Sequence, residues 1–247
     1  MATKNLLVEL FVEELPPKAL KKLGEAFAVG VLESLKAQGL AGEDSVATPF
    51  ASPRRLAVHV TAVYDRAADK PVSHKLMPVS VALTAEGQPT PALLKKLGAL
   101  GLDAGVLDRL KRAPDGKAEA LFFDTVVPGA ALAAGLQKAL DEAIARLPIP
   151  KVMTYQLADG WSTVNFVRPA HGLVALHGEE VVPVTTLGLK AGRETRGHRF
   201  EAACDPVVLN GADSYESQLE ADGAVIPSFA KRRADIVRQL HAAAGQV

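Results

Sequence analysis

The sequence predicts an α+β domain in which amphipathic helices pack on a mixed or antiparallel sheet. A strand pattern followed by a helix pattern occurs twice in the first two thirds of the chain, and layers of helices on a sheet bury both patterns. With 247 residues, 48% of them hydrophobic, the chain can build a sizeable core. Its single cysteine, Cys204, cannot form an internal disulfide. This indicates a reducing compartment and a fold that is stabilised by its hydrophobic core.

The first strand is predicted at residues 6–12, where every second residue is apolar. Glu9 and Glu13 fall on the opposite face of this strand, where they could form a paired-carboxylate site. The sequence offers no second acidic cluster to complete such a site. We therefore favour the interpretation that this face is the polar, solvent-facing side of the strand.

Helical spacing replaces the alternation after Pro17 and predicts an amphipathic helix that ends near Gly39. A second strand is predicted at residues 55–62, where apolar and polar residues again alternate. The pair of patterns then recurs as a third strand at 118–127 and a helix at 132–147. These four elements form the expected framework of the domain.

Residues 67–117 are rich in Pro, Gly, Asp and Lys and contain only one short helical run, so we interpret them as a peripheral insertion. The α+β domain as a whole is predicted to span 1–200 and to include a hairpin at 166–184 that turns at Gly178. Residues 201–247 are predicted to be the start of a helical module. We expect that module to be truncated and the chain to be the first part of a longer protein.

Charge and motifs exclude several classes of function. The 28 basic residues are balanced by 28 acidic residues, which argues against binding nucleic acid through the overall field but leaves a local basic patch open. The sequence lacks a phosphate-binding P-loop, a dinucleotide-binding glycine motif, a nucleophile elbow and a zinc helix. We therefore assign no catalytic residue and no metal ligand. No hydrophobic run is long enough to span a bilayer, so we expect a cytoplasmic protein without a membrane partner.

The densest basic segment is GLKAGRETRGHRF at residues 188–200. If its glycines bend the chain, its basic side chains could converge on a phosphate or a carboxylate, and two arginines at a strand entry are weaker candidates for the same role. The candidate anion-binding residues are Arg193, Arg196, His198, Arg199, Arg54 and Arg55. The alternative is that these side chains make internal ion pairs or lie on solvated strand ends.

Four short segments of the sequence occur together, in this order, in one known family. They are LLVELFVEELPP at 6–17, SPRRLAV at 52–58, FVRPAHGLVAL at 166–176 and RETRGHRF at 193–200. On these segments the chain resembles the beta subunit of the bacterial heterotetrameric glycyl-tRNA synthetase. The resemblance implies that these residues are the N-terminal portion of that subunit, with a domain similar to the B3/B4-type domain of the phenylalanyl enzyme's beta chain.

The resemblance also implies a function in charging tRNA with glycine. In that family an alpha subunit activates glycine with ATP and Mg, while the beta subunit supplies tRNA recognition. The fragment itself would then hold no cofactor, and its partners would be the alpha subunit, tRNA(Gly) and a second beta subunit. Two alternatives remain: a subunit-docking scaffold without direct tRNA contact, and a free-standing editing hydrolase, for which the sequence shows no positioned nucleophile or base.

Overall fold

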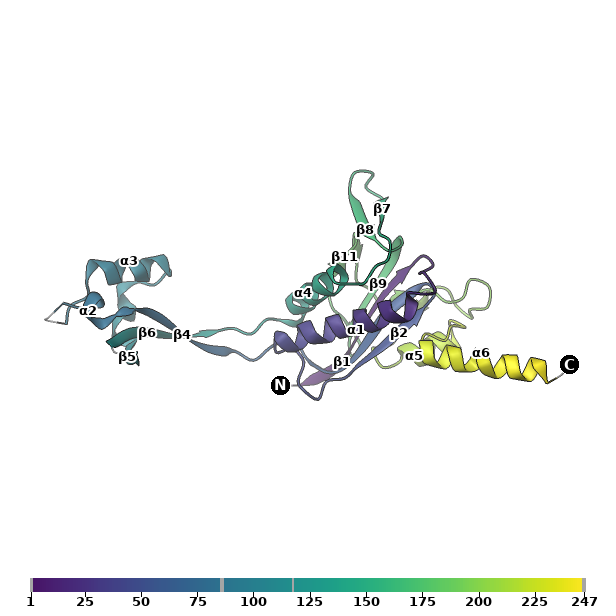
Figure 1. The fold of residues 1–247 in the computed structure, drawn as a ribbon, viewed down its shortest axis with the longest axis horizontal. Coiled ribbons are helices and arrows are strands. Elements are labelled where there is room, and N and C mark those ends of the chain that lie inside the picture. The colour runs from purple at the N-terminus through teal and green to yellow at the C-terminus, as the bar shows by residue number, and fades with distance from the viewer. Residues whose placement is uncertain (1, 85–86, 117, 246–247) are drawn as a thin grey trace. The chain divides into compact units, whose positions relative to one another are not determined.

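The computed structural model describes residues 2–84, 87–116 and 118–245, which fold into two compact units (Figure 1). Unit 1 comprises Met1–Ala67 and Ala130–Val247, and unit 2 comprises Ala68–Gly129. Unit 1 contains the amino-terminal strand pattern and all six candidate anion-binding residues.

The core of unit 1 is a five-stranded sheet with the order β10-β9-β1-β3-β2, in which every pair of neighbours is antiparallel. Its strands are β1 (Thr3–Val12), β2 (Ala47–Ser52), β3 (Arg55–Tyr64), β9 (Ala170–His177) and β10 (Glu180–Val181). The expected α+β class with an antiparallel sheet is therefore confirmed. β1 is the central strand, so both of its edges are hydrogen-bonded and neither can face solvent.

Two helices, α1 (Leu20–Ala37) and α4 (Leu132–Ala145), cover one face of this sheet (Figure 1). The alternate apolar residues of β1 and the apolar stripes of both helices belong to one buried cluster. The helices approach closely because glycine faces alanine between them: a Cβ at Gly30 would lie 3.1 Å from the Cβ of Ala143. Both helices and the strands β1 and β3 are where the sequence predicts them.

The carboxy-terminal part of unit 1 covers the opposite face of the sheet. A second buried cluster joins sheet residues to β14 (Val207–Val208) and α5 (Tyr215–Ala221), and the rings of Phe50 and Tyr215 meet edge to face at 5.2 Å. The prediction that the Glu9 face of β1 is exposed to solvent is therefore wrong. Glu9 is 1% exposed, because residues about two hundred positions later in the sequence pack over it.

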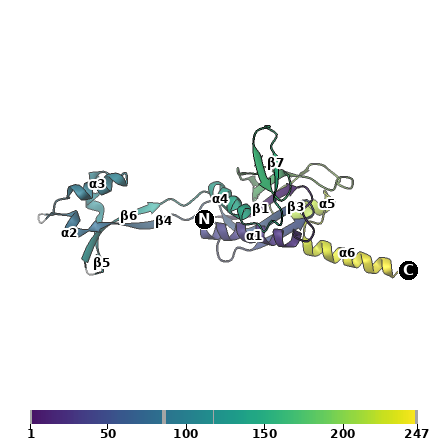
Figure 2. The ribbon, with the colours of Figure 1, turned by 45° about the horizontal axis from the view of Figure 1, so that its top comes forward.

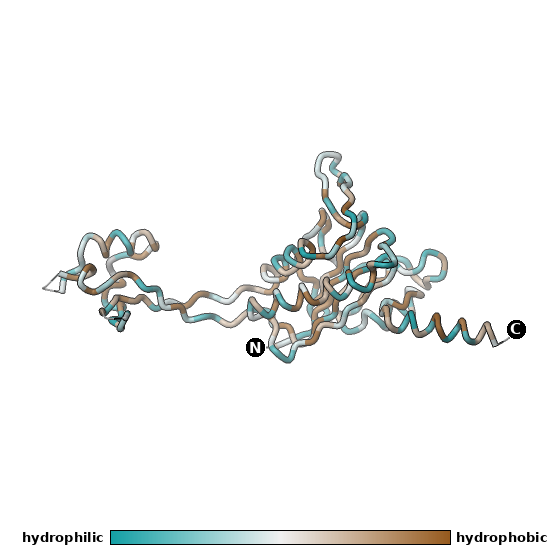
Figure 3. The backbone as a smooth tube through the Cα atoms, viewed as in Figure 1, coloured by the Kyte–Doolittle hydropathy of each residue, from teal (hydrophilic) through white to brown (hydrophobic). Residues whose placement is uncertain are grey.

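Unit 1 contains six further described elements. They are β7 (Met153–Gln156), β8 (Thr163–Phe166), β11 (Thr185–Thr186), β12 (Leu189–Lys190), β13 (Glu194–Thr195) and α6 (Phe229–Ala244). The β7–β8 hairpin and α6 both project from the rest of unit 1 in two views (Figures 1 and 2). Brown hydrophobic segments run through the sheet in Figure 3, whereas α6 alternates between colours and has no buried residue. None of the described helices is both long and apolar enough to cross a membrane.

Unit 2 has a small sheet and core of its own. Its elements are β4 (Lys70–Pro78), α2 (Val79–Ala82), α3 (Pro91–Ala99), a 3₁₀ helix (Ala104–Arg109), β5 (Leu110–Asp115) and β6 (Ala118–Val127). The antiparallel strand order is β4-β6-β5, and the buried cluster includes Leu93, Leu97 and Phe123. The hydroxyl of Thr90 caps α3 by accepting a hydrogen bond from the Leu93 backbone N–H at 3.4 Å.

The structure differs from the sequence-based expectation in unit 2. The strand predicted at 118–127 exists, but it pairs with β4 and β5 and does not belong to the main sheet. Strand periodicity does not reveal a strand's partner, and β4 lies in a stretch whose lysines and prolines are typical of a loop. The hairpin predicted at 166–184 is confirmed as β9 and β10, with Gly178 at φ +61° in its turn. The division of the chain at residue 200 stays a prediction.

Candidate functional site

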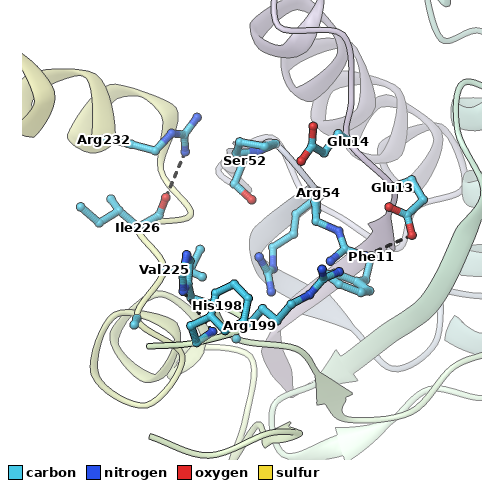
Figure 4. Close-up of a pocket in the computed structure, with 15 residues that line it drawn as sticks. Phe11, Glu13, Glu14, Ser52, Arg54, His198, Arg199, Val225, Ile226 and Arg232 are labelled. Atoms are coloured by element: carbon cyan, nitrogen blue, oxygen red, sulfur yellow. Dashed lines mark hydrogen bonds and ion pairs between the residues drawn. The ribbon is translucent and has the colours of Figure 1, made fainter. Parts of the chain in front are cut away.

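Four of the six candidate residues, Arg54, Arg55, His198 and Arg199, line one pocket of about 560 Å³ in unit 1 (Figure 4). Its wall is formed by the end of β1, the turn between β2 and β3, the loop at 197–200 and the turn at 224–226. Segments far apart in the sequence thus bring their basic side chains to one place. Four arginines and two glutamates, Glu13 and Glu14, are among the lining residues, so positive charge prevails there.

The turn between β2 and β3 positions the first two arginines. Ser52 pairs with Arg55 across the hairpin, which leaves Pro53 and Arg54 as the two turn residues. Proline suits a turn because its φ is fixed and it needs no hydrogen-bond acceptor for its nitrogen. The backbone N–H of Val12 donates to the Arg54 carbonyl at 2.9 Å, so the turn is held against the end of β1.

Arg54 is held by three contacts at the wall of the pocket. Its Nη2 lies 3.2 Å from Glu13 Oε1, its Nε donates to the Val12 carbonyl at 3.3 Å, and its guanidinium carbon lies 4.7 Å from the centre of the Phe11 ring. Arg55 approaches the same ring at 5.2 Å. Phe11 therefore orients both arginines through cation–π contacts.

Arg55 belongs to a buried polar cluster behind the pocket. Its Nε lies 3.2 Å from Glu9 Oε2, and its side chain is only 4% exposed. Thr195 and Tyr215 donate their hydroxyl hydrogens to the two carboxylate oxygens of Glu9. Nη2 of Arg55 and Oγ of Ser52 are buried and have no hydrogen-bond partner among the described residues. Both atoms are closed off from solvent, so they are not exposed to a ligand in the pocket.

The loop at 197–200 is fixed by a close backbone approach. A Cβ at Gly197 would lie 2.8 Å from the carbonyl oxygen of Gly223, so only glycine fits there, and the His198 N–H donates to that oxygen at 2.6 Å. The His198 Nδ1 accepts hydrogen bonds from the backbone N–H groups of Phe200 and Glu201 at 3.3 and 3.2 Å. In the neutral ring the proton is therefore on Nε2.

Arg199 and Phe200 are the least constrained residues of the pocket. Across the part of the chain that the structure describes, the Arg199 guanidinium has no hydrogen-bond or ion-pair partner. Its side chain extends toward Phe11 and Arg54 in Figure 4. Phe200 is 83% exposed although its ring contacts His198 edge to face at 6.2 Å. An arginine without a partner among the described residues is thus followed in the sequence by an exposed aromatic residue.

The other two candidate residues lie outside this pocket and make internal contacts. Arg193 donates from Nη2 to the Glu179 carbonyl at 2.6 Å and from Nη1 to the Leu209 carbonyl at 3.5 Å. Arg196 forms an ion pair with Asp205 at 3.1 Å. The six candidates therefore do not converge on a single ligand, because the chain directs Arg193 and Arg196 to other surfaces of unit 1.

Three lining residues were missed in the sequence. Phe11 is in the first strand pattern, on the face that also carries Glu9 and Glu13, and Phe200 ends the basic segment that supplied four candidates. Arg232 belongs to a basic run that resembles an ordinary charged helix face. In the structure it donates to the Ile226 and Ala51 carbonyls at 3.0 and 2.9 Å, and burial lowers its pKa. The adjacency of Arg199 and Phe200 was the signal available for the second of these residues.

No group of three or more His, Cys, Asp and Glu side chains suited to a metal ion occurs within the described ranges. The nearest approach at the pocket is a pair, in which His171 Nε2 lies 2.8 Å from Glu13 Oε1. Glu13 Oε1 also lies 3.2 Å from Arg54 Nη2, so this carboxylate contacts two side chains. Its role in the pocket is to orient those partners.

The Tyr215 hydroxyl makes the free energy of unfolding depend on pH in the alkaline range. Burial, and next the Glu9 carboxylate, raise the pKa of its hydroxyl well above 10.0. The unfolded chain loses this proton near pH 10 while the folded protein keeps it. The protonated Tyr215 hydroxyl therefore makes its full contribution to the free energy of unfolding below pH 10. Above pH 10 the free energy of unfolding should fall by up to about 1.4 kcal/mol per pH unit. Denaturant unfolding of Tyr215→Phe should show a shallower fall than the wild type, and equal falls would contradict the assignment.

Comparison with known proteins places the chain in a family. The model of the family described as glycyl-tRNA synthetase beta subunit matches residues 6–247. The chain belongs to the glycyl-tRNA synthetase beta subunit family. The membership inferred from four short segments is therefore confirmed. Within the fold, the first, second and fourth of these segments border the pocket, and the third supplies β9.

Relatives called glycine–tRNA ligase beta subunit match nearly the whole chain. The protein of Leptothrix cholodnii is 73% identical over 99% of this chain, and the match covers 34% of that protein. The protein of Thiobacillus denitrificans is 68% identical over 99% of the chain and 35% of its own length. The protein of Janthinobacterium is 64% identical over 100% and 35%. The chain thus spans about a third of the length of the glycyl-tRNA synthetase beta subunits that it matches.

Proposed function

We propose that this chain is a tRNA-recognition and assembly region of a glycyl-tRNA synthetase beta subunit, and that the pocket at Arg54 and Arg199 binds the tRNA backbone. It would support the ATP-dependent charging of tRNA with glycine without a catalytic residue of its own. The observation that carries the proposal is the unpaired Arg199 guanidinium, which reaches into a pocket where arginines outnumber carboxylates. Family membership supplies tRNA as the anion.

The chemistry of the pocket suits a phosphate. A guanidinium group can donate two parallel hydrogen bonds to phosphate oxygens, and the Arg199 guanidinium donates to none of the described residues. Arg54 is already oriented by Phe11 and Glu13, so little side-chain entropy would be lost when it binds.

The finer assignments follow from the same resemblance. We propose that unit 1 is B3/B4-like and that the alpha subunit is the partner that activates glycine with ATP and Mg. tRNA(Gly), a second beta subunit and a cytoplasmic location belong to the same proposal. Support comes from the family membership and from the α+β architecture with antiparallel sheets.

A docking scaffold is the second candidate function. It is favoured by the internal contacts of Arg193 and Arg196, which fix the chain around β13. It is also favoured by α6, where Ile236 and Leu240 are 51% and 64% exposed. The two functions are compatible, because the residues that favour docking lie outside the pocket.

The test is tRNA binding by the assembled alpha and beta subunits carrying Arg199→Gln. We expect weaker binding and a slope of log affinity against log salt that is reduced by about 0.7 to 0.9, the value for one lost phosphate contact. Arg112→Gln is the matched control, since it removes an exposed arginine of unit 2 that does not line the pocket. If Arg199→Gln leaves affinity and salt slope at the wild-type values while the fold is intact, the pocket does not bind tRNA.

A further inference from the structure

We propose that the pocket receives one unpaired nucleotide, with its phosphate on Arg199 and Arg54 and its base stacked on Phe200. This inference rests on the proposed tRNA binding and narrows it from the nucleic-acid backbone in general to a single-stranded position. Two observations carry it: an exposed aromatic ring that follows an unpaired arginine in the lining of the pocket, and the size of the pocket.

The aromatic ring is the first observation. An 83% exposed phenylalanine costs hydration free energy unless a ligand covers it, and Phe200 directly follows the unpaired Arg199. A cation that holds the backbone beside a ring that stacks the base is the combination by which proteins bind single strands. The other aromatic residue of the pocket, Phe11, already faces two arginines, so Phe200 is the ring available for stacking.

The shape of the pocket is the second observation. A volume of about 560 Å³ is in the range of sites for small molecules and single nucleotides. A base in a duplex is stacked between its neighbours and cannot reach an aromatic ring, whereas an unpaired base can turn out of the strand. Glu13 and Glu14 also line the pocket, and their negative charge disfavours a run of phosphates. The site therefore fits one phosphate with its base.

The experiment compares a labelled single-stranded oligoribonucleotide with its duplex on the assembled enzyme, using fluorescence anisotropy. Phe200→Leu should weaken binding of the single strand about 5- to 100-fold, the range for one lost stacking contact. Phe200→Trp should bind at least as well as the wild type, and duplex binding should be the same in all variants. Trp161→Leu is the matched control, because it removes a 91% exposed aromatic side chain outside the pocket.

Each outcome decides between the two proposals. If Phe200→Leu binds the single strand as tightly as the wild type, or loses the single strand and the duplex equally, the nucleotide site is overturned. If Arg199→Gln still weakens tRNA binding in that case, the pocket is a backbone-phosphate site and the proposed function stands. If neither variant changes the binding of tRNA or oligonucleotide, both proposals fail.

Discussion

Glu9→Gln is expected to lower the free energy of unfolding by about 3–5 kcal/mol. Glu9 and Arg55 form an ion pair at 3.2 Å with side chains that are 1% and 4% exposed. The amide is isosteric with the carboxylate, so packing is preserved while the Arg55 charge loses its partner. An uncompensated buried charge is far more costly than the loss of an ordinary hydrogen bond. The measurement is equilibrium denaturation of the purified chain.

The effect should spread to the layer that carries the pocket. The Glu9 carboxylate accepts hydrogen bonds from Thr195 of β13 and Tyr215 of α5, so a single side chain of β1 joins the sheet to both elements. A weakened attachment of this layer should increase amide hydrogen exchange over residues 194–221 more than in α1. This local readout distinguishes loss of the buried cluster from a uniform decrease in stability.

Two further variants test the cause. Glu25→Gln removes the exposed partner of Lys21 on α1 and should change stability by no more than about 0.5 kcal/mol. The double variant Glu9→Leu with Arg55→Met removes both buried charges and should recover part of the stability lost by Glu9→Gln. Two results would contradict this cause: a loss below about 1 kcal/mol for Glu9→Gln, or a double variant that is less stable than Glu9→Gln. Either result would show that Glu9 does not compensate the buried charge of Arg55.

The error about Glu9 shows what local sequence pattern can and cannot predict. The alternation at residues 6–12 correctly indicates a strand and assigns its apolar face to the helices. The same alternation suggests that the other face is exposed to solvent, because a glutamate lies on it. What covers that face is set by tertiary structure: Val207, Leu209 and Tyr215 arrive from the far end of the chain. Periodicity carries no information about such distant partners.

The site was predictable to a similar degree. The basic segment and the Ser-Pro-Arg-Arg turn were recognised as candidates, and Arg54 and Arg199 lie on the same pocket. Spacing alone did not separate these residues from Arg193 and Arg196, because side-chain direction depends on how the loop folds. A hydrogen bond from Arg193 to the Glu179 carbonyl pairs residues fourteen positions apart, which no short motif encodes.

Leu97→Ala in unit 2 is expected to unfold that unit while unit 1 stays folded. Leu97 is 1% exposed within a small core, and truncating such a side chain costs about 2–5 kcal/mol. A core of this size supplies only about 3–5 kcal/mol in total. The buried cluster of unit 2 contains residues of unit 2 alone. The two buried clusters of unit 1 likewise contain residues of unit 1 alone. The loss should therefore be confined to residues 68–129.

Hydrogen exchange followed by mass spectrometry measures this directly. Peptides from β4 and β6 should lose protection in Leu97→Ala, while those from β1 and α1 should keep it. Leu94→Ala is the matched control, because Leu94 lies on the same helix but is 42% exposed, and its truncation should leave protection unchanged. Loss of protection in both units would mean that they unfold cooperatively, and full protection of β6 would mean that the cluster around Leu97 does not hold unit 2 together. Since the sequence of this region is typical of loops, its stability must come from the few buried contacts of that cluster.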